Sequence, residues 1–139
     1  MQAHDHIDRI VTTQIDDRIL ISYVRGSWTM AQFQANHEYS QSFVRQLNDT
    51  GDWASLVVIE DTLVSCIDVL EAGRNAIPTN PDCSHLKALA WVIAPEIEGY
   101  VLLRARYRAI FEGILPNQIF SAIDEAKAWL QAQLSATPT

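Results

Sequence analysis

The stretch Arg18–Thr29 reads Arg-Ile-Leu-Ile-Ser-Tyr-Val-Arg-Gly-Ser-Trp-Thr and contains the junction on which the fold depends. Its first half, Ile19–Val24, is an almost unbroken apolar series with β-branched residues, which is typical of a strand covered on both faces. Gly26 gives the backbone conformational freedom where this strand ends. Thr29 and Gln32, three residues apart, form a capping box that predicts the start of a helix. The stretch therefore predicts a buried strand that leads directly into a helix.

The segment before this stretch predicts an antiparallel partner for the strand. Val11–Ile15 is a short run with β-branched residues, and Asp16 and Asp17 separate it from Ile19. Aspartate favours turns because its short side chain bonds to the local backbone and because it tolerates a left-handed conformation. We therefore expect a hairpin at the beginning of the fold.

The segment after this stretch repeats the plan of a strand followed by a helix. Compact apolar runs bounded by polar residues or proline predict strands at 53–59, 87–94 and 118–120, and helical spacing predicts helices at 63–77, at 96–112 and from Ser121 onward. Such alternation implies parallel strands joined by right-handed crossovers. We predict an α/β domain with a four- to five-stranded, mostly parallel sheet and an N-terminal antiparallel hairpin, in the order β-β-α-β-α-β-α-β-α. This single domain covers residues 1–139, with residues 1–8 and 136–139 frayed.

Composition limits the classes of partner. The chain has 139 residues, enough for one domain with a sizeable core, and its net charge of -7 disfavours nucleic acid and anionic membranes. The longest apolar run, 88–95, is far shorter than the ~20 residues that span a bilayer. The N-terminal residues lack the pattern of a signal peptide. We therefore expect a cytoplasmic protein in which Cys66 and Cys83 are reduced thiols.

Three segments together resemble the STAS-like families, which include anti-sigma-factor antagonists and the cytoplasmic tails of sulfate transporters. They are the hairpin Ile15–Ile21, the Gly-Ser-Trp-Thr sequence at 26–29, and Phe120–Leu130, which reads Phe-Ser-Ala-Ile-Asp-Glu-Ala-Lys-Ala-Trp-Leu. The resemblance covers nearly the whole chain and is greatest to small bacterial stand-alone proteins of this fold. It implies a non-enzymatic regulatory or protein-interaction module. Its relation to the CRAL-TRIO fold implies an alternative function, binding of a small molecule or lipid in a pocket at the carboxyl ends of the strands.

The resemblance also implies a place for a regulatory phosphorylation. Anti-sigma-factor antagonists carry a phosphorylatable serine at the start of the helix that follows the central strand, in a context such as Asp-Ser-Ser-Gly. The corresponding stretch here, Ile59–Asp68, offers Thr62 and Ser65 and lacks the glycine. A phosphate at a helix start is favoured by the free backbone amides there. The alternative interpretation is that Ser65 is an ordinary helix cap.

Polar residues follow the strands at the edge where open parallel sheets bind ligands and partners. The predicted binding residues at this edge are Ser27, Trp28, Glu60, Asp61, Thr62 and Ser65. The alternative interpretation is that these residues only end strands and cap helices. A second predicted patch, for an anion or an acidic partner, consists of Arg104, Arg106 and Arg108. These arginines could instead form a solvated face on which Arg108 pairs with Glu112.

The sequence contains no signature of catalysis or of a bound metal. Its five glycines form neither a nucleophile elbow nor a phosphate-binding loop. The histidines and acids near the N-terminus, and the pair Cys83 and His85, do not supply the four ordered ligands of a closed zinc site. We therefore predict no enzymatic activity, metal or cofactor. The expected partner is another protein or a second copy of the chain, or else a small ligand in a cavity lined by Trp28, Tyr100, Tyr107 and Phe111.

Overall fold

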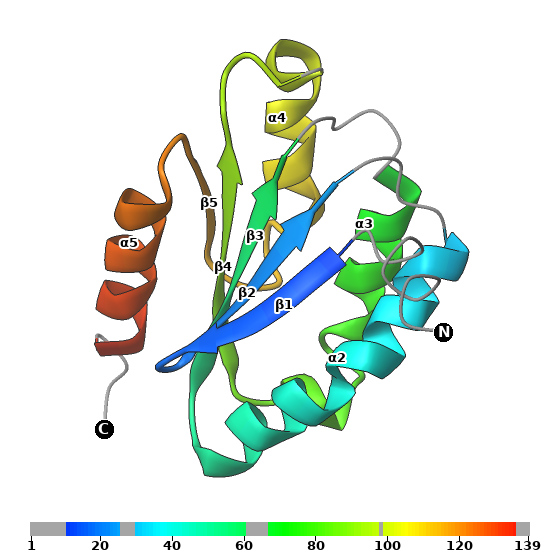
Figure 1. The fold of residues 1–139 in the computed structure, drawn as a ribbon, viewed down its shortest axis with the longest axis vertical. Coiled ribbons are helices and arrows are strands. Elements are labelled where there is room, and N and C mark those ends of the chain that lie inside the picture. Colours follow the sequence, from blue (N-terminus) through cyan, green and yellow to red (C-terminus); the bar gives the residue numbers. More distant parts are fainter. Residues whose placement is uncertain (1–10, 26–29, 61–66, 98, 136–139) are drawn as a thin grey trace.

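The computed structural model describes residues 11–25, 30–60, 67–97 and 99–135 and shows one five-stranded sheet (Figure 1). The strands follow one another across the sheet in chain order, β1 to β5. Only β1 and β2 are antiparallel, and every later pair is parallel. This arrangement confirms the predicted α/β fold with its N-terminal hairpin. The strands are β1 (Val11–Asp16), β2 (Ile19–Val24), β3 (Trp53–Ile59), β4 (Leu86–Ile93) and β5 (Asn117–Phe120).

The helices lie on both faces of the sheet. The connecting helices α2 (Met30–Thr50), α3 (Ile67–Ala76) and α4 (Tyr100–Ile110) share one face, and α5 (Ile123–Ser135) lies on the other (Figure 1). Because each crossover moves one strand further in the same direction, right-handed connections place all three connecting helices on the same side. Among the described helices, α5, which follows the last strand, is the one that covers the opposite face.

Two predicted helix starts were placed too early. The helix predicted at 96–112 begins at Tyr100, because Gly99 at its N-cap has a φ of 88° that interrupts the helical backbone. The helix predicted from Ser121 begins at Ile123. The predicted starts at Thr29 and near residue 63 lie outside the described residues.

The hairpin turn forms where the two aspartates predict it. Asp16 pairs with Ile19 at the end of the ladder, so the loop consists of Asp17 and Arg18. Asp17 has a φ of 57°, in the left-handed region that aspartate tolerates better than most residues. This tight turn determines the register that directs Ile19 and Ile21 to one face of the sheet and Leu20 to the other.

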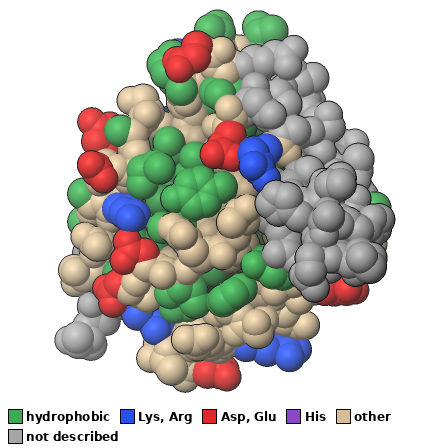
Figure 2. Space-filling model, in the orientation of Figure 1, with side chains coloured by type: hydrophobic (Ala, Val, Ile, Leu, Met, Phe, Trp, Pro, Cys, Tyr) green, Lys and Arg blue, Asp and Glu red, His purple; other side chains and the backbone are tan. Residues whose placement is uncertain are grey.

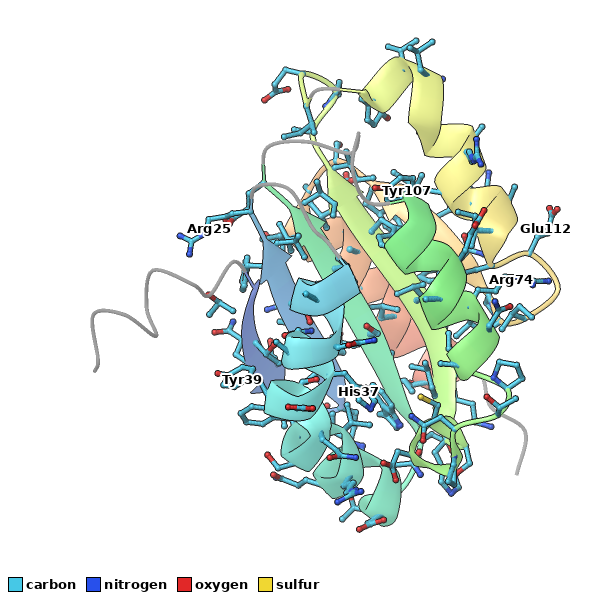
Figure 3. All side chains as sticks on the ribbon, turned by 90° about the vertical axis from the view of Figure 1, so that its right-hand side faces the viewer. Arg25, His37, Tyr39, Arg74, Tyr107 and Glu112 are labelled. Atoms are coloured by element: carbon cyan, nitrogen blue, oxygen red, sulfur yellow. The ribbon has the colours of Figure 1, made fainter. Side chains whose placement is uncertain are left out.

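The core has two layers, one on each face of the sheet. Trp91 forms the centre of the layer under α3 and α4, with its ring centroid 5.2 Å from that of Tyr107 and 5.7 Å from that of Phe111. Tyr107 projects from α4 toward the sheet (Figure 3). The layer under α5 contains small residues of the central strands, Ala54, Ala88 and Ala90, and the small Ala126 of α5 itself, which let that helix approach the sheet closely. Trp53 and Trp91 are buried and Trp129 is half-buried, so these three tryptophans contribute to the core, whereas Trp28 is outside the described residues.

The middle of α2 carries polar side chains in two different environments. Ser40 is buried, and its hydroxyl lies 3.5 Å from the carbonyl oxygen of His37. His37 is exposed. This part of α2 therefore has both a buried and a solvent-exposed polar residue.

Polar side chains link the elements at the amino end of the parallel strands. The Asn48 amide nitrogen donates to the Pro81 carbonyl (3.1 Å) and the Ser84 hydroxyl (3.0 Å). Its oxygen accepts from the Trp53 indole nitrogen (2.9 Å) and the His85 backbone nitrogen (2.8 Å). One buried side chain therefore joins α2, β3 and the short 3-10 helix Pro81–Cys83 that precedes β4.

Arg18 in the hairpin turn closes the C-terminal end of α2. Its guanidinium donates to the carbonyl of Leu47 (2.6 Å), the hydroxyl of Thr50 (2.7 Å) and the carbonyl of Asp52 (2.9 Å). The last four carbonyls of a helix have no partner within the helix, and Leu47 carries one of them. Arg18 therefore connects the hairpin turn to the C-terminal end of α2, the helix that follows β2 in the chain.

Candidate functional site

The carboxyl ends of β2, β3 and β4 meet at one edge of the sheet, as the sequence predicts for parallel strands. The Glu60 backbone nitrogen donates to the Val24 carbonyl (2.9 Å), which brings the residues after β2 and β3 together. Arg25 Nε lies 3.9 Å from Glu60 Oε1, and both side chains are largely solvent-exposed. Of the six residues predicted here, Glu60 is therefore present at this edge with Arg25 as its partner. Ser27, Trp28, Asp61, Thr62 and Ser65 lie outside the described residues.

Two aliphatic side chains at the same edge are exposed. Val101 is 79% and Leu102 85% exposed, and the next most exposed large hydrophobic residue among those described, Tyr39, is only 36% exposed. Both lie in the first turn of α4, which follows the carboxyl end of β4, and Figure 2 shows hydrophobic side chains projecting at this end of the molecule. The sequence contained a signal for them. Four consecutive apolar residues, 100–103, cannot all face the core from one helix, so some must face solvent.

The three arginines of α4 do not form one patch. Residues two apart in a helix are separated by about 200° around its axis, whereas residues four apart lie on the same side. Arg106 accordingly reaches toward α3, where its Nη2 lies 3.8 Å from Glu71 Oε2. Arg104 and Arg108 face the other side of α4. Binding of an anion or acidic partner by these arginines stays a prediction, with Arg106 on a different side of α4 from the other two. Arg108 and Glu112, both in the described part of the chain, form no ion pair.

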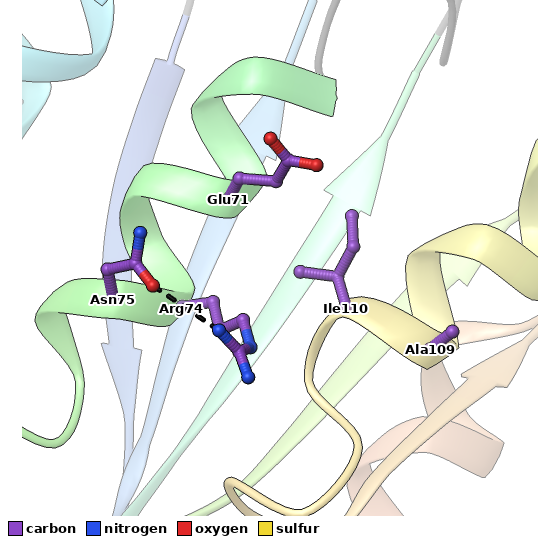
Figure 4. Close-up of a pocket in the computed structure, with 5 residues that line it drawn as sticks. All are labelled: Glu71, Arg74, Asn75, Ala109 and Ile110. Carbon is purple, nitrogen blue, oxygen red and sulfur yellow. Dashed lines mark hydrogen bonds between the residues drawn. The ribbon is translucent and has the colours of Figure 1, made fainter.

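A groove separates α3 from α4 (Figure 4). Its volume is about 340 Å³, and it is lined by Glu71, Arg74, Asn75, Ala109 and Ile110. Arg74 Nη1 donates to Asn75 Oδ1 at 3.3 Å across the turn of α3. Since Glu71 also pairs with Arg106, the charges around this groove are largely balanced.

A second groove separates α4 from the edge strand β5, and we call it the α4–β5 groove. Its volume is about 310 Å³, and its lining residues are Tyr100, Arg104, Ala105, Arg108, Gln118 and Ile119. Arg104 lies over the Tyr100 ring, with its guanidinium carbon 5.2 Å from the ring centroid. Its Nη1 is 3.4 Å from the Tyr100 hydroxyl.

The apolar cavity predicted for a small ligand is not formed by the described residues. Tyr107 is 0% and Phe111 3% exposed, and both pack against Trp91 in the core. Tyr100 is half-buried and lines the α4–β5 groove instead, while Trp28 lies outside the described residues. The helical spacing of these aromatic residues therefore indicated the core face of α4.

The potential metal ligands and titratable groups are dispersed. Within residues 11–25, 30–60, 67–97 and 99–135, no group of three or more His, Cys, Asp or Glu side chains could hold a metal ion. His85 Nδ1 lies 3.1 Å from Asp52 Oδ1, and the Lys87 ammonium lies 3.9 Å from the same oxygen. All three residues lie at the amino end of the sheet, opposite the edge where ligands of parallel sheets usually bind. In the part of the chain that the structure describes, no helix is long and apolar enough to cross a membrane.

The Cys83 thiol is expected to react more slowly with iodoacetamide at pH 8 than free cysteine does. Cys83 is half-buried, and burial, followed by the neighbouring negative charge of Asp82, raises its pKa above the ordinary value of 9.0. Only the thiolate reacts, so a higher pKa leaves less reactive species. Mass spectrometry of the peptide that contains Cys83 would measure the rate. The rate should rise in urea, and a folded-state rate equal to that of free cysteine would contradict the prediction.

Together, these observations define an α/β domain with a polar and aliphatic edge at the carboxyl ends of its strands and two grooves beside α4. Comparison of the chain with protein-family models, with curated proteins and with solved structures gives no match. Functional inference for this chain therefore depends on its own residues.

Proposed function

We propose that the chain is a non-enzymatic, STAS-like protein-interaction module that binds a regulatory partner protein through one edge of its sheet. We call this edge the rim surface and define it by Arg25, Glu60, Val101 and Leu102. The observation that carries the proposal is the exposure of Val101 and Leu102, which is 79% and 85%. Ser27, Trp28, Asp61, Thr62 and Ser65 remain predicted members of the same surface.

The rim surface has the composition of a binding site for protein. Protein interfaces combine an apolar centre with a polar border, and a few well-placed side chains supply most of the affinity. Burial of an aliphatic side chain is worth about 1.5–3 kcal/mol. Val101 and Leu102 gain little of this energy when the domain folds, so most of it is available for association. Arg25 and Glu60, at the same end of the sheet, present both signs of charge and can orient a partner.

The partner that fits is a folded protein with an apolar patch bordered by polar groups. The rim surface projects from the end of the domain, which suits contact with another surface better than enclosure of a small molecule. The STAS resemblance supports a regulatory partner, because anti-sigma-factor antagonists act by binding other proteins.

The double substitution of Val101→Asp and Leu102→Asp is expected to abolish partner binding without unfolding the domain. Both side chains are exposed, so the carboxylates are solvated in the free protein and would be desolvated only in a complex. Each detected partner should be recovered at least tenfold less, since the loss of one hot-spot side chain costs more than ~1.4 kcal/mol. Quantitative mass spectrometry after affinity purification from the native host measures this recovery.

The matched control is Ala128→Asp, which places a carboxylate on an exposed position of α5. It should retain every partner at the wild-type level. Circular dichroism and urea unfolding should show that all variants are folded. Retention of all partners by the double variant would overturn the proposed surface. A complex that contains only a second copy of the chain would overturn the proposed regulatory partner and would be recognised by sedimentation of the purified protein.

A further inference from the structure

Two arginines of α4, Arg104 and Arg108, have no carboxylate partner among the described residues and no neutral carbonyl or amide acceptor either. Acidic residues outnumber basic ones by 17 to 10. Most of the described basic side chains lie close to the carboxylate of an acidic residue. Those within 4 Å of a carboxylate are Arg25, Arg45, Lys87, Arg106 and Lys127. Arg18 and Arg74 instead donate to neutral oxygens. In the described part of the chain, no carboxylate lies within 4 Å of the guanidinium of Arg104 or Arg108.

These two arginines line the same groove. They lie one turn apart on α4, the spacing at which side chains on one side of a helix are neighbours. Both border the α4–β5 groove, which Arg106 does not line. Exposed like charges one turn apart destabilise a helix slightly, so the pair makes no evident contribution to folding. A bound anion would relieve this repulsion.

The groove is rigidly supported beneath α4. On the buried side of this helix, Tyr107 and Phe111 pack against Trp91, with ring centroids 5.2 Å and 5.7 Å apart. This packing holds the backbone from which both arginines project. Arg104 is further oriented by its contact with the Tyr100 ring. Preorganised guanidinium groups bind carboxylate and phosphate oxygens with good geometry because they present pairs of parallel N–H donors.

We propose that the α4–β5 groove binds a small organic anion, with Arg104 and Arg108 holding its charged head. The head would be a carboxylate or a phosphate, the two groups that a guanidinium fork recognises. Ala105 and the half-buried Ile119 supply apolar surface for the body of the ligand, and Gln118 offers an amide at the edge. The volume of about 310 Å³ is at the lower end of the range for small-molecule sites, which suits a short aromatic or aliphatic body. The rim surface shares no residue with this groove, so this inference does not depend on the proposed partner protein.

Titration with phenyl phosphate, benzoate and inorganic phosphate tests the proposal. Backbone and arginine Nε–H resonances would be followed by ¹⁵N-edited NMR at low salt. We expect phenyl phosphate or benzoate to shift resonances of α4 and β5 in a saturable way, and inorganic phosphate to bind more weakly because it lacks an apolar body. Tighter binding of phenyl phosphate than of benzoate would show that the groove prefers a phosphate head. Tighter binding of benzoate would show that it prefers a carboxylate head.

Arg104→Gln and Arg108→Gln are each expected to weaken binding at least tenfold, which is the effect of losing charge-assisted hydrogen bonds. The matched control is Arg106→Gln, which removes the same charge from the same helix on its other side and should bind as the wild type does. Equal weakening by all three substitutions would overturn the proposal, because it would indicate general attraction to a cationic helix. The absence of saturable shifts up to about 10 mM of each anion, which corresponds to a binding free energy weaker than about -3 kcal/mol, would also overturn it.

Discussion

Replacement of Asn48 by alanine is expected to lower the free energy of unfolding by about 3–5 kcal/mol. The Asn48 amide uses both its oxygen and its nitrogen, and each makes two hydrogen bonds. Alanine would leave the buried indole nitrogen of Trp53 without its acceptor, and burial of an unpaired donor costs about 1–3 kcal/mol. The Pro81 carbonyl and the His85 backbone nitrogen would also lose their bonds to this side chain. Urea unfolding followed by tryptophan fluorescence and circular dichroism measures the change.

Asp49→Ala is the matched control for this prediction. Asp49 is the next residue of α2 and is exposed, so its truncation should change the free energy of unfolding by no more than about 0.5 kcal/mol. Trp53→Phe removes one donor of the same network. A double-mutant cycle between Asn48→Ala and Trp53→Phe should give a coupling energy of about 1 kcal/mol or more. Additive effects of the two substitutions, or a loss below about 1 kcal/mol for Asn48→Ala, would show that the network contributes little.

The fold could be predicted from the sequence because its signals are local. The apolar run of Ile19–Val24, the aspartates at 16 and 17, and the alternation of strands and helices each act within a few residues. The same patterns show why all later strands are parallel. The start of α4 was predicted too early, because the preference of Gly99 for a positive φ was not distinguished from the apolar periodicity around it. A glycine next to a helical pattern is therefore a better boundary signal than the first apolar residue.

The candidate surfaces could be predicted only in part. The position of Glu60 follows from parallel topology, since the carboxyl ends of parallel strands share one edge. The division of the α4 arginines follows from helical geometry, yet only the structure shows that Glu71 of α3 pairs with Arg106. The Asn48 network could not be predicted, because its partners Pro81 and Ser84 are 33 and 36 residues away along the chain. Single polar contacts between distant residues leave no periodic pattern in a sequence.

Replacement of Arg18 by alanine is expected to lower the free energy of unfolding by about 2–4 kcal/mol. The three hydrogen bonds of its guanidinium join the hairpin turn to the end of α2 and to the residue before β3. Hydrogen bonds to charged groups contribute about 1.5–3 kcal/mol each when buried, and the partial exposure of Arg18 reduces that sum. A cation at a helix C-terminus also interacts favourably with the helix dipole. Chemical unfolding at neutral pH and low salt would measure the loss.

Arg18→Lys and Arg25→Ala separate the geometry of the guanidinium from its charge. Lysine keeps the charge but cannot direct donors toward Leu47, Thr50 and Asp52 at once, so Arg18→Lys should recover less than half of the lost stability. Arg25→Ala removes an exposed arginine whose ion pair with Glu60 spans 3.9 Å, and it should cost no more than about 0.5 kcal/mol. If Arg18→Lys were as stable as the wild type, the contribution would be the charge at the helix end alone. If Arg18→Ala cost no more than Arg25→Ala, the link between hairpin and helix would not stabilise the fold.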